Sequence, residues 1–411
     1  MDFTLDETQQ AVVRAAAGVL GQGRAAPADV PGQGRAAAAD VPGQARAAPA
    51  PGPEDGDGFD AALWKELGRA GLLSLALPAW LGGDGLGVLE VALALTEVGR
   101  RAAAVPALVT LALGVLPVVR WGDRDLQRAL LDGVASGDTV LTAAVREPTG
   151  VMPEAPATTA RLARGPGEPG TVSGLKVGVP YGAAADWILV PASIAAGGTG
   201  VVIVARSSGG VSLRRTHSAA GQPEYTLRLD RAPVAHVLGA ATGDGEAAGG
   251  RALSDLYRLA VAGACSVADG ALAAALALTT AHVRTREQFG RPLATFQAVA
   301  GQIADVYITS RTLHLATLSA CWRLATGREA GEDLDVAAYW LADQATTALR
   351  TCHHLHGGIG MDVSYPLHRY SSLVKDLARF VGGAEHRLER LGERADEDPA
   401  GADPAGSGGD G

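Results

Sequence analysis

The spacing of apolar residues changes twice along this chain, and this succession limits the possible folds more than any other feature. From Phe59 to about Leu131, apolar residues recur three and four positions apart, as in helices that bury one face. From about Thr139 to Gly239 they form short runs broken by Gly and Pro, as in strands. From Leu253 to Leu391 long helical segments return, joined by short turns. The order predicts a mostly α chain with a central β domain.

These changes also indicate the domain boundaries. We expect an N-terminal helical domain over residues 1–138, a middle β domain over 139–240 and a C-terminal helical bundle over 250–394. A chain of 411 residues, 47% of them apolar, is long enough to bury a substantial core and to divide in this way. The end of the chain is rich in Gly, Asp and Pro, which predicts a disordered tail over 395–411.

An eleven-residue motif rich in Gly, Pro and Ala occurs three times in succession between Gly21 and Pro53. Such a composition cannot build a core, so we expect a disordered insertion over about residues 21–57. Expansion of a loop by slippage accounts for the copies most simply. A docking segment is the alternative.

The composition excludes several classes of function. The net charge of -9 and the dispersed Arg residues argue against a nucleic-acid surface, which needs clustered Lys and Arg. Cys265, Cys321 and Cys352 lack the paired spacing of a zinc site or a disulfide framework, so we expect no metal and a reducing cytoplasm. The acidic start of the chain is unlike a signal peptide. The apolar stretch 103–119 contains two prolines and is too short for a membrane span, so we expect no membrane passage.

Two motifs in the second helical region carry side chains suited to a dinucleotide. The first is Arg-Glu-Gln-Phe-Gly-Arg-Pro-Leu, from Arg286 to Leu293, with Gln297 shortly after it. The second is His-Gly-Gly-Ile-Gly, from His356 to Gly360, followed by Tyr365 and Pro366. A guanidinium can hold a pyrophosphate with two parallel hydrogen bonds, and a Gly-Gly turn lets the backbone approach a ligand closely. An aromatic ring and an amide can flank the dinucleotide.

These motifs resemble those of the acyl-CoA dehydrogenase family, and a weaker likeness covers most of the chain outside the repeat and the tail. The resemblance implies an N-terminal helical domain, a middle β-barrel domain and a C-terminal four-helix bundle, with FAD as cofactor and an acyl-CoA as substrate. It also implies that the motif residues reach the FAD of a neighbouring subunit across a dimer interface. The implied FAD contacts are Arg286, Phe289, Gln297, His354 (where the family has Gln), Gly357 and Gly358.

The catalytic base of the family is missing from both places where its members carry it. In the family reaction a glutamate removes the Cα proton while the Cβ hydride passes to the flavin. Val381 stands at the usual position of this glutamate and Tyr257 at the alternative one, so we assign no catalytic residue. Asp255 and Glu385 are carboxylates nearby in the sequence, but a shift of two or four positions points a side chain elsewhere.

The positions that would face a flavin bound to the same subunit have changed as well. Gly178 and Pro180 stand where the family has the Trp and Thr that cover the isoalloxazine ring. Arg146 replaces a Thr before Glu-Pro, and Gly383 replaces another Thr. The residues offered to a neighbour's flavin are mostly retained.

The favoured hypothesis is therefore a base-lacking subunit of a heteromeric acyl-CoA dehydrogenase, paired with a second acyl-CoA dehydrogenase subunit that holds most of the FAD. The family also suggests an electron-transfer flavoprotein as electron acceptor, and its heteromeric members include those of bacterial sterol side-chain breakdown. Two alternatives stay open. One is a homo-oligomeric flavin dehydrogenase with a displaced base, and the other is a non-redox subunit that keeps the fold for subunit contacts alone.

Overall fold

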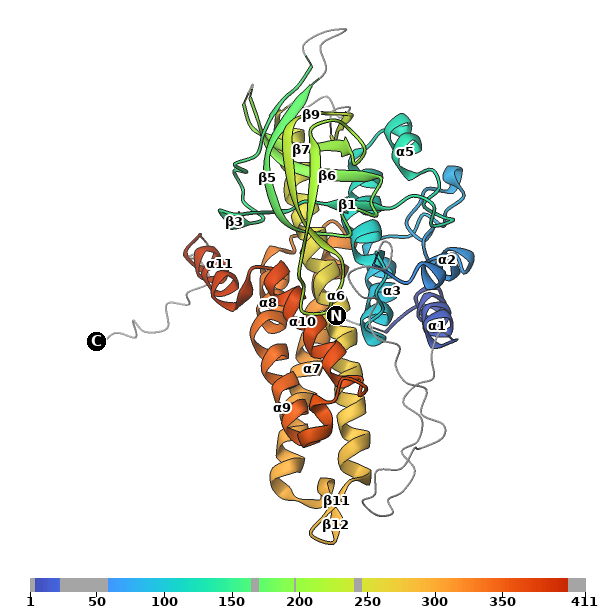
Figure 1. Ribbon diagram of the computed structural model, residues 1–411, viewed down its shortest axis with the longest axis vertical. Helices are drawn as coiled ribbons and strands as arrows, with labels where there is room; N and C mark the ends of the chain where they lie inside the picture. The colour runs from blue at the N-terminus through green and yellow to red at the C-terminus, as the bar shows by residue number, and fades with distance from the viewer. Residues whose placement is uncertain (1–3, 23–57, 164–169, 196, 240–245, 398–411) are drawn as a thin grey trace, which may run out of the picture.

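The chain folds into three connected parts, as the computed structural model in Figure 1 shows. The β domain forms one end of the molecule, the helical bundle extends to the other end, and the N-terminal helices lie beside the junction. The predicted repeat insertion lies outside the described residues apart from residues 21 and 22, which end a helix. The predicted tail lies outside them after residue 397. The structure describes residues 4–22, 58–163, 170–195, 197–239 and 246–397.

The N-terminal part is helical, as predicted. Asp60 and Asp123 each accept a hydrogen bond from the backbone N–H three residues later and so cap the helices that follow them. The inner faces of the helices bury Trp64, Leu95 and Leu113 almost completely. The helices are α1 (Glu7–Gln22), α2 (Ala61–Arg69), η1 (Ala79–Leu81), α3 (Val88–Arg100), the π-helix η2 (Leu108–Val115), α4 (Leu116–Trp121) and α5 (Arg124–Leu131).

The middle part is a β-sheet that, in the described residues, runs in the order β10-β7-β6-β4-β5-β9-β8, with β1 paired to β6 off this path. The pairs β1–β6 and β4–β6 are parallel and the other pairs are antiparallel. Its strands are β1 (Leu141–Ala143), β4 (Thr159–Arg161), β5 (Thr171–Pro180), β6 (Trp187–Ile194), β7 (Thr199–Ala205), β8 (Val211–Thr216), β9 (Glu224–Pro233) and β10 (His236–Val237). A separate hairpin joins β2 (Arg146–Glu147) to β3 (Gly150–Val151).

A fully buried ion pair fixes the loop that follows this hairpin. The Lys176 ammonium donates to Glu147 Oε1 and to the Pro191 carbonyl, both at 2.7 Å. The Glu147 carboxylate also accepts the backbone N–H groups of Ala157 and Thr158. Because both charged groups of the pair have hydrogen-bond partners, burial is tolerated. The loop that follows β3 is held at Ala157 and Thr158 by the carboxylate that pairs with Lys176 on β5.

The C-terminal part is the predicted helical bundle. Its long helices are antiparallel and carry a small β-hairpin at the end distant from the β domain (Figure 1). The elements are α6 (Glu246–Thr285), β11 (Glu287–Gln288), β12 (Arg291–Pro292), η4 (Leu293–Thr295), α7 (Gln297–Ala325), α8 (Gly331–Tyr339), the π-helix η5 (Trp340–Ala345), α9 (Thr346–His356), η6 (Gly357–Met361), α10 (Leu367–Phe380) and α11 (Gly383–Glu397).

Helix α6 connects the three parts, because it packs against α3, β7, α7 and α10. Its segment Ala248–Thr285 is long and apolar enough to cross a membrane, a feature that the sequence analysis did not single out. In the fold, 83% of the most apolar window of this segment is buried inside the protein. Such burial is that of a core helix.

Candidate functional site

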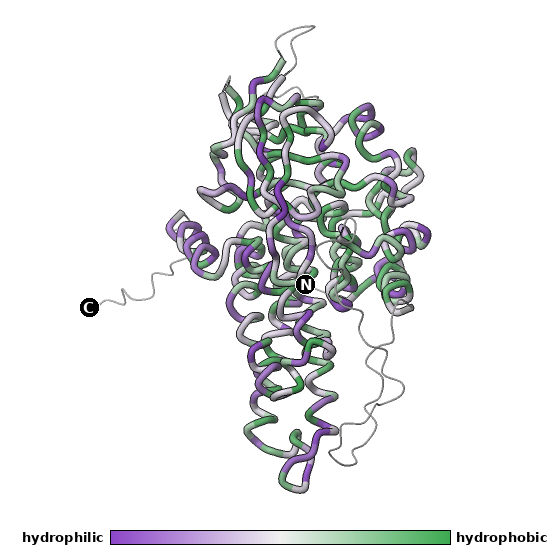
Figure 2. Tube along the Cα trace, viewed as in Figure 1, coloured by the Kyte–Doolittle hydropathy of each residue, from purple (hydrophilic) through white to green (hydrophobic). Residues whose placement is uncertain are grey.

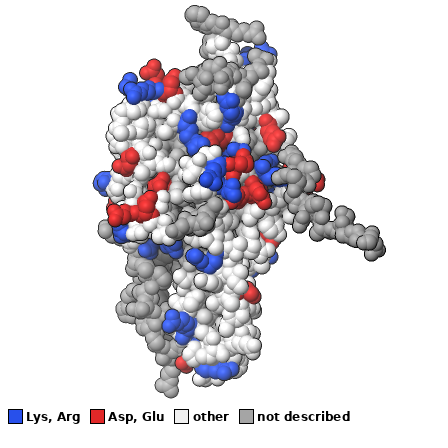
Figure 3. Space-filling view, turned by 180° about the vertical axis from the view of Figure 1, so that it is seen from behind, with Lys and Arg blue, Asp and Glu red and all other residues white. Residues whose placement is uncertain are grey.

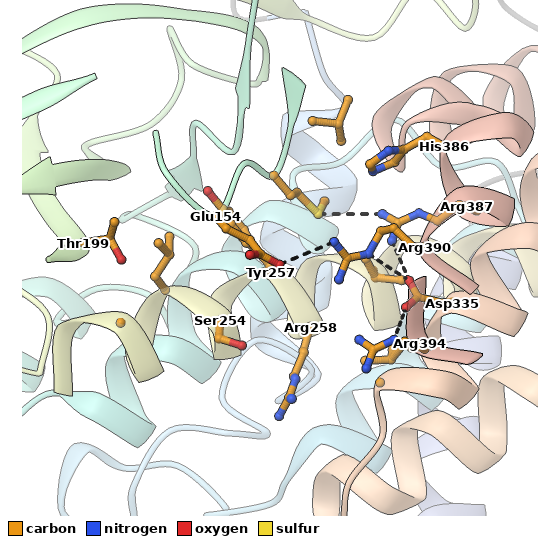
Figure 4. Close-up of a pocket in the computed structure, with 17 residues that line it drawn as sticks. Glu154, Thr199, Ser254, Tyr257, Arg258, Asp335, His386, Arg387, Arg390 and Arg394 are labelled. Atoms are coloured by element: carbon orange, nitrogen blue, oxygen red, sulfur yellow. Dashed lines mark hydrogen bonds and ion pairs between the residues drawn. The ribbon is translucent and has the colours of Figure 1, made fainter. Parts of the chain in front are cut away.

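A cleft of about 310 Å³ opens where the β domain meets the bundle. Its walls come from the β3 hairpin and the loop after it, the start of β7, and helices α6, α8 and α11 (Figure 4). Tyr257 and Arg258 enter it from α6, Asp335 from α8, and Arg387 and Arg390 from α11. Helix α11 is largely hydrophilic along its length (Figure 2), so this wall is charged.

Neither predicted base position supplies a base to the cleft. Val381 is fully buried at the turn between α10 and α11, and its carbonyl accepts a 2.7 Å hydrogen bond from Arg387 Nε. Tyr257 does line the cleft, but its hydroxyl donates to the Pro153 carbonyl at 3.1 Å. Burial raises the pKa of Tyr257 far above its usual range, so the phenol stays protonated.

The two neighbouring carboxylates that the sequence offered as displaced bases are engaged or exposed elsewhere. Asp255 Oδ2 accepts hydrogen bonds from Arg120 Nε and Trp121 Nε1, both at 2.7 Å, and so faces α4. Glu385 is exposed on the first turn of α11. Among the described residues that line the cleft, the carboxylates are Glu154 and Asp335 instead.

Asp335 is held by three guanidinium groups of α11, so its carboxylate is engaged in ion pairs within the protein. Its carboxylate lies 2.9 Å from Arg387 Nη1, 2.7 Å from Arg394 Nε and 3.5 Å from Arg390 Nε. The other carboxylate, Glu154, is 88% exposed at the mouth of the cleft.

A second ionic cluster fills the space beside Gly178, where the resemblance places a ring-covering Trp. A Cβ atom built on Gly178 would lie 2.7 Å from Arg146 Nη1, 3.4 Å from Glu224 Oε1 and 3.5 Å from Arg379 Nη1. Arg379 forms an ion pair with Glu224. Burial lowers the pKa of Arg146, and within the described part of the chain Arg146 Nε is buried without a hydrogen-bond partner.

This arrangement does not fit an isoalloxazine ring on the chain's own side. Arg146 and Arg379 are two cations that meet next to a backbone position with no side chain to cover a flavin. Gly178 has a φ of +63°, so restoring a Trp there would also strain the backbone. Of the residues predicted to face the subunit's own flavin, Arg146 and Gly178 are thus brought together, in an ionic cluster with Glu224 and Arg379.

The predicted contacts to a neighbour's flavin lie at the opposite end of the bundle. The hairpin β11–β12 carries Phe289 at its tip, where this side chain is 93% exposed and has a φ of +54°. The tip marks the lower end of the molecule in Figure 1. All six predicted contact residues are exposed: Arg286, Phe289, Gln297, His354, Gly357 and Gly358.

A stack of rings ties the Gly-Gly turn to the end of α6. His282 and His356 stack with their centroids 4.5 Å apart. His356 Nδ1 lies 2.8 Å from the Cys352 carbonyl and its Nε2 lies 3.0 Å from the Tyr365 hydroxyl. The turn after α9 is therefore anchored on its inner side, while Gly357 and Gly358 face outward with nothing within 4 Å of the positions where a Cβ would stand.

Several large apolar side chains are exposed on this part of the bundle. Large side chains stand exposed on the hairpin, on η6 and after it, and on α7, and the bundle face seen in Figure 3 carries few charges. Exposed large apolar side chains in one part of a molecule are typical of a protein–protein contact. The exposed side chains are Phe289, Tyr307, Ile308, Leu315, Ile359, Met361 and Val363, and we call them the apolar tip.

Sequence reasoning missed the arginines of α11. Arg387, Arg390 and Arg394 recur three and four positions apart, which puts them on one helix face. That spacing was a usable signal. Within the part of the chain that the structure describes, no group of three or more His, Cys, Asp or Glu could hold a metal ion, and all three cysteines are buried and unpaired.

The chain matches known proteins over most of its length. The acyl-CoA dehydrogenase N-terminal domain matches residues 37–138 and the acyl-CoA dehydrogenase C-terminal domain matches residues 255–395. Acyl-CoA dehydrogenase FadE28 of Mycobacterium tuberculosis is 46% identical over 80% of this chain and 91% of its own length. Acyl-CoA dehydrogenase FadE27 of the same organism is 36% identical over 83% and 90%.

Two solved structures of heteromeric proteins superpose on nearly the whole chain. A variant of the Tcur3481-Tcur3483 steroid ACAD is 32% identical with a TM-score of 0.81, covering 97% of this chain and 100% of that one. The ChsE4-ChsE5 complex from Mycobacterium tuberculosis is 31% identical with a TM-score of 0.81, covering 97% and 99%. The expected order of helical, β and helical parts is confirmed, and the chain belongs to the acyl-CoA dehydrogenase family.

Proposed function

We propose that this chain is the base-lacking subunit of a heteromeric acyl-CoA dehydrogenase that oxidises an acyl-CoA thioester between its α and β carbons. In this assembly the bound FAD supplies the hydride acceptor and is seated mainly in a second acyl-CoA dehydrogenase subunit. The present chain contributes Arg286, Phe289, Gln297, His354, Gly357 and Gly358 to that site.

One observation carries the proposal: the site for the chain's own flavin lacks its functional groups, whereas the positions that would contact a neighbour's flavin keep theirs. At the β domain end, Val381 and Tyr257 leave the cleft without a base, and Arg146 fills the space beside Gly178. At the bundle end, Arg286 and its companions remain exposed and surrounded by the apolar tip. A subunit that used its own flavin would need a base and an open flavin site beside the β domain. A subunit that completes a partner's site needs only the exposed motif residues at the far end of the bundle.

The names of similar proteins support the same assembly. Both solved structures at 31–32% identity are named as pairs of different subunits, and one is called a steroid ACAD. We propose by analogy an acyl group attached to a steroid or similar lipid as substrate, an electron-transfer flavoprotein as acceptor, and the cytoplasm as location. A homo-oligomer with Asp255 or Glu385 as base is disfavoured by the contacts of Asp255 and the exposure of Glu385.

The test is co-expression with an acyl-CoA dehydrogenase homologue from the same genome that carries Glu at either base position. We expect this chain alone to be flavin-poor and inactive, and the complex to hold about half an equivalent of FAD per chain, as one site of each unlike pair would give. A yellow, active homo-oligomer of this chain alone would sink the proposal.

Variants at the tip separate a flavin-completing subunit from a non-redox scaffold. Arg286→Gln should lower the flavin content and activity of the complex without splitting the subunits, because it removes a charged contact but little apolar surface. Arg284→Gln is the matched control, since it makes the same charge change at an exposed position two residues earlier on α6. If the complex keeps its flavin in both variants, the scaffold alternative holds.

A further inference from the structure

A short segment of the loop after β3 forms part of the wall of the cleft and is anchored to the β domain at both ends. At its start, the Met152 N–H donates to the Val145 carbonyl at 3.0 Å. At its end, the Pro156 carbonyl accepts a 2.6 Å hydrogen bond from Ser193 Oγ of β6. Residues 153–155 lie between these two anchors, and we call them the strap. Because the anchors lie at its ends, the strap can move without unpairing a strand of the sheet.

Two contacts tie the strap to helices on the bundle side of the cleft. The Tyr257 hydroxyl of α6 donates to the Pro153 carbonyl at 3.1 Å. Glu154 Oε1 lies 3.8 Å from Arg390 Nη1 of α11. The second contact is weak, because the Glu154 side chain is 88% exposed and water screens the pair. The hydrogen bond from Tyr257 is therefore the stronger of the two links between the strap and the bundle.

Met152, directly before the strap, has a backbone conformation that depends on the contacts around it. Its φ is +51°, in the left-handed region that a residue with a Cβ atom seldom adopts. Such a conformation persists where the surrounding structure fixes it. Met152 is 8% exposed, and its sulfur lies 3.9 Å from Arg387 Nη2 inside the cleft (Figure 4). Release of the strap would let this residue return to a relaxed conformation and would expose its sulfur to water.

We propose that the strap is a lid on the cleft and that the Tyr257 hydroxyl is its latch. The strap is closed in this structure, and the cleft opens wider to solvent when the hydrogen bond from Tyr257 to the Pro153 carbonyl breaks. Tyr257 stands at one of the two positions where the family carries its glutamate, so here this position holds a wall of the cleft instead of removing a proton. Burial, with Glu147 nearby, raises the pKa of Tyr257 far above its usual range, so the latch keeps its proton at neutral pH.

The experiment is oxidation of the full-length chain by hydrogen peroxide, followed at each methionine by mass spectrometry. Peroxide converts an accessible methionine thioether to the sulfoxide. The chain has three methionines, and Met361, which is 76% exposed, is an internal reference for the buried Met152. In the original chain, Met152 should oxidise much more slowly than Met361. Tyr257→Phe, which keeps the ring and removes the hydroxyl, should raise the Met152 rate about fivefold and leave the Met361 rate unchanged, as the loss of one neutral hydrogen bond implies.

A matched variant and a second measurement separate a latch from a general loss of stability. Tyr307→Phe makes the same chemical change at a tyrosine of α7 that is 55% exposed, and it should leave the Met152 rate unchanged. Hydrogen exchange of the peptide 148–158 should become faster in Tyr257→Phe, whereas exchange in β7 should stay as in the original chain.

Three results would overturn the proposal. The first is an unchanged Met152 rate in Tyr257→Phe, and the second is oxidation of Met152 as fast as Met361 in the original chain. The third is faster exchange in β7 as well as in 148–158, because the hydroxyl would then stabilise the whole fold instead of latching the strap. The chain is tested without flavin and without a partner subunit, so these outcomes do not depend on the proposed function.

Discussion

Asp335 is the buried carboxylate that pairs α8 with the arginines of α11. Its carboxylate compensates Arg387, which is 3% exposed, and contacts two further guanidinium groups. A buried pair adds little stability relative to apolar residues of the same size, because both ions lose their hydration. Removal of one partner leaves the other charge uncompensated, which is strongly destabilising.

We therefore expect Asp335→Asn to lower the free energy of unfolding by about 3–5 kcal/mol. The control is Asp333→Asn two residues away, whose partner Arg323 has 36% of its side chain exposed. A partly exposed pair of that kind contributes at most about 1 kcal/mol. Urea denaturation of both variants measures the difference, and equal losses would show that Asp335 does not compensate a buried charge.

His282 gives the protein a sensitivity to acid. Burial, with His356 and Arg286 nearby, lowers the pKa of this imidazole to about 4 from its ordinary 6.5. Between these values the unfolded chain binds a proton that the folded chain does not, so stability is full above pH 6.5 and falls as the pH drops toward 4.

His282→Phe should reduce the loss of stability between pH 6.5 and pH 4, because phenylalanine keeps a ring against His356 but cannot be protonated. The expected gain relative to the original chain is on the order of 1 kcal/mol at pH 5 and absent at pH 7.5, allowing for screening by solvent. Denaturation curves at the two pH values test this. A variant whose stability changes by the same amount at both would contradict it.

At the level of residues, the sequence indicates which residue type stands at a motif position, but not which side chains contact each other in the fold. The absence of Glu at positions 381 and 257 could be recognised from motif spacing alone. The spacing of Arg387, Arg390 and Arg394 was equally visible, but Asp335 lies 52 residues before Arg387. Nothing local indicates which of the many carboxylates would meet them, because long-range pairing is set by how α8 and α11 pack.

At the level of elements, the contact between α3 and α6 depends on two glycines. A Cβ built on Gly99 would lie 1.9 Å from the Val267 carbonyl oxygen, and one on Gly270 would lie 1.8 Å from the Thr96 carbonyl oxygen. Both obstacles are backbone atoms of the facing helix, which cannot rotate away. The N-terminal helices reach the bundle only because these two positions carry no side chain.

Gly99→Ala should therefore lower the free energy of unfolding by about 1–3 kcal/mol or more, which is the usual range for overpacking. This loss is expected despite the better helix propensity of alanine. Gly18→Ala is the matched control, since nothing lies within 4 Å of its Cβ position on α1. Propensity alone predicts a gain there of about 0.5–1 kcal/mol. Thermal unfolding measures the stability of the two variants. Equal stability of Gly99→Ala and Gly18→Ala would contradict a close contact between the backbones of α3 and α6.

Apolar spacing predicted the type of most elements but not their details. The helical stretches follow from an apolar period of 3.6 residues, and the strand region follows from short apolar runs broken by Gly and Pro. The π-helices η2 and η5 do not, because one extra residue in a turn leaves the apolar pattern nearly unchanged. The sheet order also could not be predicted, since β4 and β1 pair with β6 in parallel across intervening strands.

At the level of the whole molecule, the charged cleft lies where the β domain meets the bundle, whereas the hairpin β11–β12 lies at the far end of the bundle (Figure 1). The apolar tip exposes seven large side chains, among them Met361 at 76% and Val363 at 83%. A chain that exposes such side chains to water gains free energy by covering them. Contact with a partner at the tip should leave the distant cleft uncovered.

Hydrogen exchange tests this separation directly. On addition of the partner subunit, we expect slower amide exchange in segments 286–297 and 354–363, because these segments carry the exposed flavin-contact positions and four side chains of the apolar tip, Phe289, Ile359, Met361 and Val363. Segment 386–394, which bears the arginines of the cleft, should exchange at an unchanged rate with the partner. Protection that appears first in segment 386–394 on addition of the partner would mean that the subunits meet through the cleft, so that the tip must have another occupant.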